Sequence, residues 1–462
     1  MDLVIQNGVI VTASDVFQAD VGIAEGTIVA LGKGLSAPQT LDASGHLVCP
    51  GFVDPHVHLQ MRSGDLCSAD DFVTGTIAAA CGGTTTILDF AEAHDEPLTE
   101  AVARRRAGAD DRVAVDYSLH LTGNADDAAF LDDVRRLASA GYTSMKCYTT
   151  YPGLRVNDAQ MLRLFALCRE EGILPLVHCE NHAVVEHLRR RLWEEGRRSL
   201  AAHPLSRPPE AEAEAAWRVL TLAQVAGVAV YLVHVSARDT LEVLRWARRR
   251  GQDAYAEVCP QHLLVDDRVY ARPFEEAAPF VYAPPSRPAE HLPALWAALK
   301  AGELQTVATD HCPWNLAGQK DRGREDFTRM PNGGAGIETR PVLLYSEGVR
   351  KRGLPLTRFV DACATAPARL FGLYPKKGTI AVGADADLVV WDPEAQWTLG
   401  RSALHQNVDH CPFEGWAVQG RPRWVFLRGR MVAEEGEFVG EVGMGRFLRR
   451  GRFTHGGTGV PL

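Results

Sequence analysis

The chain has 462 residues, of which 46% are hydrophobic and 23% are charged, and its formal net charge is -9 at pH 7. This composition is ordinary for a globular protein, and it excludes wholesale disorder, a collagen-like repeat and a coiled-coil rod. The acidic balance argues against a nucleic-acid partner, because such proteins normally carry a basic surplus or a basic stripe. At roughly 150 residues per domain, the length predicts two or three domains.

Three further features indicate the compartment. The amino terminus has no basic segment before an apolar core, so it does not resemble a signal peptide, and we expect a cytoplasmic protein. The longest charge-poor apolar stretch, 219–235, is shorter than the ~18 to 20 residues that span a bilayer, which predicts no membrane segment. The ten cysteines include no C-x-x-C pair, so we interpret them as buried thiols and not as disulfides or zinc ligands.

The two ends of the chain share a β pattern. Residues 1–50 alternate apolar and polar side chains, which predicts a small antiparallel β unit with hairpin turns at Asn7-Gly8 and Glu25-Gly26. Similar patterning returns over 374–440, so we predict that both ends build one small β-sandwich domain. The remaining tail, 441–462, is rich in glycine and arginine, and we interpret it as a flexible terminus.

Over 51–373, short β-rich runs alternate with amphipathic segments, which is typical of parallel βα units. The eight runs cover 51–59, 84–90, 114–123, 143–150, 174–180, 228–236, 253–262 and 305–311. Helices are predicted over 70–80, 98–107, 125–140, 158–171, 211–226, 237–250 and 289–300. This α/β order favours a (β/α)8 TIM-like barrel, in which chemistry lies at the carboxyl ends of the strands. A doubly wound sheet is the alternative.

Metal-ligand side chains follow several of these runs. His56 and His58 lie two residues apart, so in an extended strand both point to the same side. His178, His234 and Asp310 lie at the ends of the fifth, sixth and eighth runs. Because a barrel brings its strand ends to one mouth, we expect these five side chains to form one metal site.

The other histidines divide into two groups. Four lie near strand ends and are candidates for supporting the ligands: His94, His120, His262 and His311. Six are interpreted as helix-surface, loop or interface residues: His182, His187, His203, His291, His405 and His410.

Lysine is rare in this chain. Only seven of the 49 basic residues are lysines, and Lys146 is the sole lysine between Lys33 and Lys300. It lies near the end of the fourth run, at the level of the candidate ligands. An ammonium group cannot bind a cation, but lysine reacts with carbon dioxide to give an anionic carbamate that can bridge two metals, whereas arginine offers no comparable amine. We therefore predict that Lys146 is an N6-carboxylysine; the alternative is an exposed or salt-bridged lysine.

Four histidines, one carbamate and one carboxylate are enough for two divalent metal ions per chain. Imidazole-rich coordination favours zinc, with manganese, cobalt and iron as alternatives. A hydroxide bridging the two metals would be the nucleophile. Neither a G-x-S-x-G motif nor a papain-like cysteine motif competes with this interpretation.

These motifs resemble the dihydropyrimidinase and D-hydantoinase family of the amidohydrolase superfamily, over nearly the whole chain. GFVDPHVHL resembles the first metal motif of that family, SMKCYTTY the lysine and tyrosine motif, and FTRMPNGGAGIETR the substrate loop, which is the most specific of the three. The resemblance implies hydrolysis of the cyclic amide bond of dihydropyrimidines or 5-substituted hydantoins, with N-carbamoyl amino acids as products.

The resemblance also implies a role for each motif residue. The metal ligands would be His56, His58, Lys146, His178, His234 and Asp310. Asp310 would in addition act as general base, and Tyr151 would stabilise the oxyanion. The main chain at Ala283 and Asn332 would bind the ring of the substrate. Ala283 is a departure, because the family commonly has serine there.

Two arginines lie on loops that, by resemblance, cover the exocyclic group of the substrate. Family members often carry apolar residues where this chain has Arg62 and Arg155. Two interpretations stay open: the arginines are solvated loop residues, or they select an acidic exocyclic substituent.

Related proteins provide the alternatives. Dihydroorotases resemble H-x-H-x-R, whereas this chain has Gln60 at the arginine position. Allantoinases lack a clear counterpart of the Tyr151 and PNGG pairing. Non-catalytic assembly proteins of the same fold have lost ligands, whereas all six ligand positions are filled here. The resemblance further implies a homotetramer or homodimer, with a subunit contact through 441–462.

Overall fold

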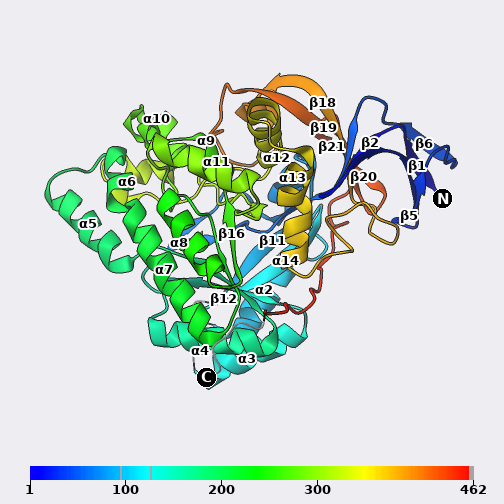
Figure 1. The fold of residues 1–462 in the computed structure, drawn as a ribbon. Coiled ribbons are helices and arrows are strands. Elements are labelled where there is room, and N and C mark those ends of the chain that lie inside the picture. The colour runs from blue at the N-terminus through cyan, green and yellow to red at the C-terminus, as the bar shows by residue number, and fades with distance from the viewer. Residues whose placement is uncertain (94–95, 125–126, 457–462) are drawn as a thin grey trace.

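The computed structural model describes residues 1–93, 96–124 and 127–456, and a parallel barrel is its largest part (Figure 1). The barrel sheet has the strand order β17-β16-β15-β14-β13-β12-β11-β8. Its strands are β8 (Phe52–Asp54), β11 (Thr84–Glu92), β12 (Asp116–Thr122), β13 (Ser144–Tyr148), β14 (Leu174–His178), β15 (Val230–Leu232), β16 (Ala254–Val258) and β17 (Thr306–Val307). A parallel bridge between Val57 and His311 joins the first and last strands just beyond their ends. The predicted (β/α)8 barrel is confirmed, and the doubly wound sheet is excluded.

Helices cover the outside of the barrel. All seven predicted helices are present, as α1 (Phe72–Cys81), α2 (Leu98–Ala109), α3 (Ala128–Ser139), α4 (Asp158–Glu171), α7 (Pro209–Ala226), α8 (Arg238–Arg249) and α11 (Leu292–Lys300). The predicted start of the third helix, at 125–126, lies outside the described residues. Local chemistry sets their ends: Asn157 and Gln160 form a capping box at the start of α4, and Gly172 ends it at a φ of 64°.

The sequence analysis missed several helical segments. These are α5 (His182–Glu194), α6 (His203–Ser206), α9 (Pro260–Leu264), α10 (Phe274–Ala277), α12 (Arg340–Leu343), α13 (Leu356–Val360) and α14 (Ala366–Leu370). The predicted strand over 253–262 is too long, because Pro260 begins α9 two residues after β16 ends.

Strands from both chain ends form the second domain, on the right of Figure 1. One sheet has the order β5-β4-β1-β6, from β1 (Leu3–Gln6), β4 (Asp20–Ala24), β5 (Thr27–Gly32) and β6 (Gln39–Asp42). The other has the order β21-β20-β19-β18-β7-β2-β3, from β2 (Val9–Val11), β3 (Val16–Gln18), β7 (Leu47–Pro50), β18 (Leu388–Thr398), β19 (Ala417–Leu427), β20 (Arg430–Glu434) and β21 (Glu437–Phe438). Buried apolar residues of both ends, including Ile5, Val21 and Phe426, share one core. The predicted sandwich is confirmed, whereas the domain bounds stay predictions.

Two details of the first fifty residues differ from the prediction. The unit is not wholly antiparallel, because β1 pairs with β6, and β2 with β7, in parallel. Asn7-Gly8 is not a hairpin turn, since β1 and β2 belong to different sheets. Glu25-Gly26 does join the antiparallel pair β4 and β5, with φ values of 49° and 76° that suit a tight hairpin.

The described part of the carboxyl-terminal tail lies on the barrel of its own chain, and it is drawn in red in Figure 1. The main-chain N–H of Leu448 donates to the Tyr117 carbonyl at 2.7 Å, and that of Phe453 donates to the Gly172 carbonyl at 2.7 Å. The buried Arg450 donates to Ser118 Oγ at 2.9 Å and Ser144 Oγ at 2.7 Å. The interpretation as a flexible terminus is therefore wrong up to Gly456, and residues 457–462 lie outside the described residues.

The structure also bears on the membrane and cysteine predictions. None of the described helices combines the length and the apolar character needed to cross a bilayer. All ten cysteines are free thiols, and nine of them are buried, which confirms their interpretation as buried thiols.

Candidate functional site

A cavity of about 740 Å³ opens at the carboxyl ends of the barrel strands. All nine residues to which the sequence analysis assigned roles line it: His56, His58, Lys146, Tyr151, His178, His234, Ala283, Asp310 and Asn332. Strand position explains this convergence. Lys146 lies in β13, His178 is the last residue of β14, and His234 follows β15 by two residues.

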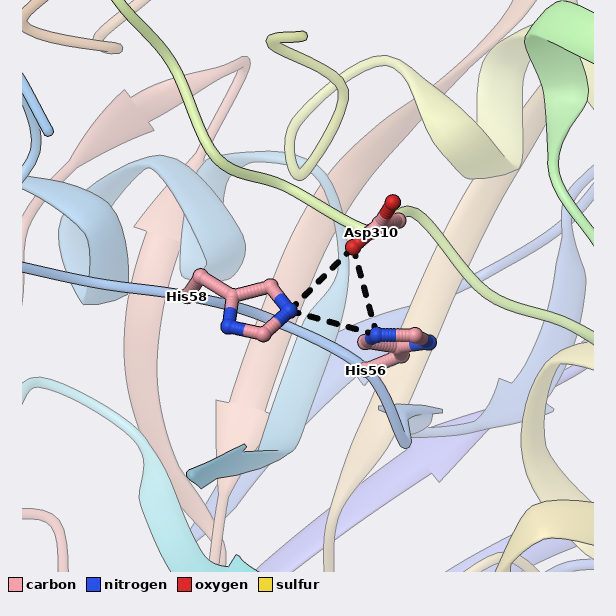
Figure 2. A group of neighbouring side chains, drawn as sticks. All are labelled: His56, His58 and Asp310. Carbon is pink, nitrogen blue, oxygen red and sulfur yellow. Dashed lines mark hydrogen bonds and ion pairs between the residues drawn. The ribbon is translucent and has the colours of Figure 1, made fainter. Parts of the chain in front are cut away.

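One group of donor atoms forms a compact triangle (Figure 2). The Oδ1 atom of Asp310 lies 3.2 Å from the Nε2 atoms of both His56 and His58. The two Nε2 atoms are 3.3 Å apart. Two ring nitrogens and one carboxylate oxygen thus surround a single point, which is the donor set that a borderline divalent cation such as zinc prefers.

A second group lies beside the first. The Nδ1 atom of His178 is 2.9 Å from Nε2 of His234. Lys146 lies beside the first group, with its Nζ 3.4 Å from Nε2 of His56, and the rings of His56 and His234 are 5.7 Å apart between their centroids. A lysine derivative at this place would therefore lie between two pairs of imidazoles.

Buried carboxylates hold the outer nitrogens of two of these rings. Nε2 of His178 is 2.7 Å from Glu180, and Nδ1 of His56 forms a short contact with Glu257. Such contacts place the ring proton on the outer nitrogen and leave the inner nitrogen as a lone-pair donor. In contrast, Nδ1 of His234 is buried without a partner among the described residues. The sequence analysis missed both glutamates, although Glu180 ends the predicted strand 174–180 and Glu257 lies within the predicted strand 253–262.

Burial sets the charge of the site. It lowers the pKa of His56, His178 and His234, so these rings are neutral and ready to bind a cation. Burial opposes the ionisation of Asp310, but the neighbouring His56 and His58 hold its pKa below the usual range. The site therefore offers neutral imidazoles together with one carboxylate.

Lys146 is an unusual lysine. It is 1% exposed, and burial lowers its pKa to about 8. Its Nζ lies near the rings of Phe90 and Tyr148, at 5.3 and 5.2 Å from their centroids. Among the described residues, it forms no ion pair with a carboxylate. The alternative of an exposed or salt-bridged lysine is therefore wrong.

Three of the assigned residues have left-handed backbone conformations. The φ values are 72° at Tyr151, 39° at His234 and 52° at Asp310. A non-glycine residue adopts such a φ at a cost, and it does so where surrounding contacts dictate it. Here the Asp310 N–H donates to the His56 carbonyl at 3.0 Å, and the His234 N–H donates to Glu257 at 3.1 Å. The same contacts that impose the strain aim the side chains into the cavity.

Tyr151 faces the ligand cluster from the loop after β13. Burial raises the pKa of its phenol, so the hydroxyl remains a hydrogen-bond donor. The centre of its ring lies 5.2 Å from that of His178 and 5.4 Å from the guanidinium of Arg207. The position of the Tyr151 hydroxyl suits a hydrogen-bond donor that points into the cavity.

Three residues of the PNGG motif, Pro331, Asn332 and Gly333, line the cavity. The Asn332 carbonyl accepts a bond from Nε1 of Trp314 at 2.9 Å, and the Gly333 N–H donates to the Val281 carbonyl at 3.0 Å. A Cβ on Gly333, whose φ is 144°, would lie 2.3 Å from the Cys312 carbonyl oxygen. Only glycine therefore lets the main chain pass here.

The remaining histidines follow the predictions in part. His120, His262 and His311 are buried near the site, and Nε2 of His120 is 2.8 Å from the carbonyl of Pro55, beside His56. His94 lies outside the described residues. Three histidines interpreted as surface, loop or interface residues are in fact buried: His203, His291 and His410. His203 also lines the cavity.

The two loop arginines differ in position. Arg62, in β9 (Arg62–Ser63), is exposed, lines the cavity and has no ion-pair partner among the described residues. Arg155 is also exposed, but it lines a separate depression together with His182 and Arg218. The placement favours a solvated role for Arg155 and leaves Arg62 facing the cavity.

Comparison with known proteins shows the family of this chain. The sequence profile of the amidohydrolase family matches residues 47–432, and that of the urease alpha-subunit N-terminal domain matches residues 1–51. The D-hydantoinase of Ralstonia pickettii is 41% identical over 456 residues, covering 98% of this chain and all of that protein. The D-hydantoinase of Geobacillus stearothermophilus is 42% identical over 458 residues, covering 98% of this chain and 97% of that protein.

Among solved structures, the dihydropyrimidinase of Brevibacillus agri superposes with a TM-score of 0.96 at 42% identity, covering 98% of this chain and 99% of that one. The sequence matches and the superposed fold both cover almost the whole length of this chain and of its relatives. The chain therefore belongs to the dihydropyrimidinase and D-hydantoinase family of amidohydrolases, and it is a hydrolytic cyclic amidase.

Proposed function

We propose that the chain opens the rings of dihydropyrimidines and 5-substituted hydantoins at the cyclic amide bond and releases N-carbamoyl amino acids. One observation carries this proposal: the imidazole, lysine and aspartate cluster shares a single cavity with Tyr151 and the PNGG wall. A metal cluster alone would suit many hydrolases. The names of the relatives, D-hydantoinase and dihydropyrimidinase, support the substrate class.

The residues present fit two divalent metal ions. His56, His58 and Asp310 would bind one, His178 and His234 the other, and the carbamate of Lys146 would lie between them. The facing ring nitrogens of His178 and His234, 2.9 Å apart, and the buried Lys146, whose Nζ lies 3.4 Å from Nε2 of His56, support this fit. The imidazole-rich set favours zinc. When bound, the metals would polarise the substrate carbonyl and lower the pKa of the attacking water.

Residues of the chain would carry out proton transfer, oxyanion stabilisation and substrate binding. Asp310 accepts the proton of the attacking water and passes it to the leaving ring nitrogen. Tyr151 donates a hydrogen bond to the oxygen that becomes negatively charged. The main chain at Ala283 and Asn332, which lines the same cavity, binds the imide edge of the ring.

The first experiment combines metal content by mass spectrometry with ring opening of dihydrouracil and hydantoin, followed by ultraviolet absorbance. We expect two metals per chain and turnover. Two metals without turnover would indicate that the substrate is another cyclic amide, such as that of an allantoinase or a dihydroorotase. Absence of both after reconstitution would favour a non-catalytic assembly protein.

Association into a homodimer or homotetramer and a cytoplasmic location also remain predictions. Because the tail lies on its own barrel as far as Gly456, any subunit contact in this region would use residues exposed there, such as Arg449. Light scattering on the purified protein measures the association directly.

Replacement of Glu257 by glutamine should weaken metal binding about 10- to 100-fold, because this carboxylate holds both the His56 ring and the His234 main chain. Competition with a chelator measures the affinity. Glu212→Gln is the matched control, since Glu212 is equally buried but bonds Ser236 and Arg287, which are not ligands. Equal chelator sensitivity of Glu257→Gln and wild type would contradict the assignment.

Tyr151→Phe should lower kcat by about 10² to 10³, which is the usual effect of removing one oxyanion donor. Metal content should stay at the wild-type level, because the hydroxyl is not a ligand. Steady-state kinetics and metal analysis on the same preparation test this. An unchanged kcat would refute the role of Tyr151.

Lys146→Ala should lose metal and activity together, because the alanine offers no amine for a carbamate. A short carboxylic acid added to the protein should restore part of both by occupying the same space. Activity lost with the full metal content still bound would contradict the carbamate.

Arg62→Ala should lower the rate on hydantoins with an acidic 5-substituent relative to those with an apolar one. An exposed cation without a partner attracts a carboxylate modestly, so we expect a change of up to about fivefold. Arg155→Ala serves as control, since Arg155 lies outside the cavity. Equal rate ratios in both variants would show that Arg62 has no part in substrate selection.

A further inference from the structure

Lys320 is a fully buried lysine directly behind the wall of the cavity. It begins the 3-10 turn η5 (Lys320–Gly323). Its Nζ donates to the Val281 carbonyl at 3.0 Å and to the Pro331 carbonyl at 3.5 Å. Among the described residues, it has no carboxylate partner. A buried amine that binds only main-chain oxygens stabilises a particular backbone arrangement, since it satisfies groups that would otherwise lack partners.

The two carbonyls belong to the segments that present the proposed substrate contacts. Val281 precedes Ala283 by two residues, and Pro331 directly precedes Asn332. The Gly333 N–H also donates to the Val281 carbonyl, at 3.0 Å. Lys320 therefore adds a second link between two stretches of chain that both reach the cavity.

Of the four main-chain carbonyls of residues 281–284, one has no hydrogen-bond donor among the described residues. Side chains hold three of the four: Lys320 binds that of Val281, His203 lies 2.8 Å from that of Tyr282, and His262 lies 2.9 Å from that of Pro284. The remaining one, that of Ala283, has no donor among the described residues. Because buried carbonyls are almost always bonded, an unpaired carbonyl on the cavity wall marks the place where a ligand N–H can bind.

The choice of lysine also fits this position. Arginine accounts for 42 of the 49 basic residues, yet this position is one of only seven lysines. An ammonium is compact and directs three donors freely, whereas a planar guanidinium needs more room and a fixed fork of acceptors. At 0% exposure there is no solvent into which a larger group could extend.

We propose that Lys320 is a positioning residue for substrate binding: it fixes the two main-chain segments so that the Ala283 carbonyl and the Asn332 main chain face the imide edge of the ring together. The inference rests on the proposed function. Lys320 touches neither the candidate metal ligands nor the reacting bond, so its removal affects substrate binding before chemistry. Burial lowers the pKa of Lys320 to about 7, and both the charged and the neutral amine keep enough N–H groups for two carbonyls.

The test compares Lys320→Met with Arg358→Met. Arg358 is the control, because it also donates to main-chain carbonyls, those of Leu299 and Gln305, which do not line the cavity; its side chain is 10% exposed and also pairs with Asp361. Lys320→Met should raise KM for dihydrouracil about tenfold or more, with kcat changed less than about threefold and metal content unchanged. Hydrogen–deuterium exchange should become faster in the peptide 327–336 of this variant only.

The outcomes separate this inference from the proposed function. A wild-type KM in Lys320→Met, or an equal KM rise in Arg358→Met, would overturn the positioning role. If the wild-type enzyme opens neither dihydrouracil nor hydantoin, the proposed function fails, whereas the exchange comparison still decides whether Lys320 holds the segment. Should Lys320→Met not fold, Lys320→Gln carries the same test, because its amide keeps two N–H donors and should give a smaller KM rise.

Discussion

The site depends on donor atoms that several strands bring face to face at the bottom of one cavity. Ring nitrogens of His178 and His234 lie 2.9 Å apart, and those of His56 and His58 lie 3.3 Å apart with Asp310 beside them. Buried polar atoms are normally paired with complementary partners. Within each facing pair of rings, one shared proton can satisfy only one lone pair, whereas a divalent cation satisfies all of them at once.

The barrel and the carboxylates behind the cluster hold its side chains in position. The barrel brings the strand ends together, and the glutamates Glu180 and Glu257 fix the rings from behind. The left-handed backbone at His234 and Asp310 costs about 1 to 3 kcal/mol at each residue. The closely packed barrel core offsets this cost, since a packed interior resists the small shifts that would release the strain. The backbone of the site is therefore strained locally, and the stability of the surrounding fold maintains this strained conformation.

Much of this architecture could be predicted from the sequence because its signals are local. Alternation of β runs and amphipathic segments predicts a barrel. In a barrel the strand-end residues lie close together, so their proximity can be predicted even when the loop conformations are not known. The errors concern long-range partners. The sequence around Asn7-Gly8 shows a turn but not that its two strands belong to different sheets. The tail looks flexible in composition, because its backbone partners at Tyr117 and Gly172 lie hundreds of residues away.

The same distinction separates the two walls of the cavity. The metal side consists of side chains, so histidine, lysine and aspartate in the sequence already indicate its chemistry. The proposed substrate side consists of main-chain groups, and any residue type can supply those; Ala283, which has no polar side chain, illustrates this. What matters there is which carbonyls are already bonded, and that depends on His203, His262 and Lys320, none of which carries a motif. In the proposed mode of binding, substrate recognition depends on residues that no sequence motif marks, although His262 stands out by its place near a strand end.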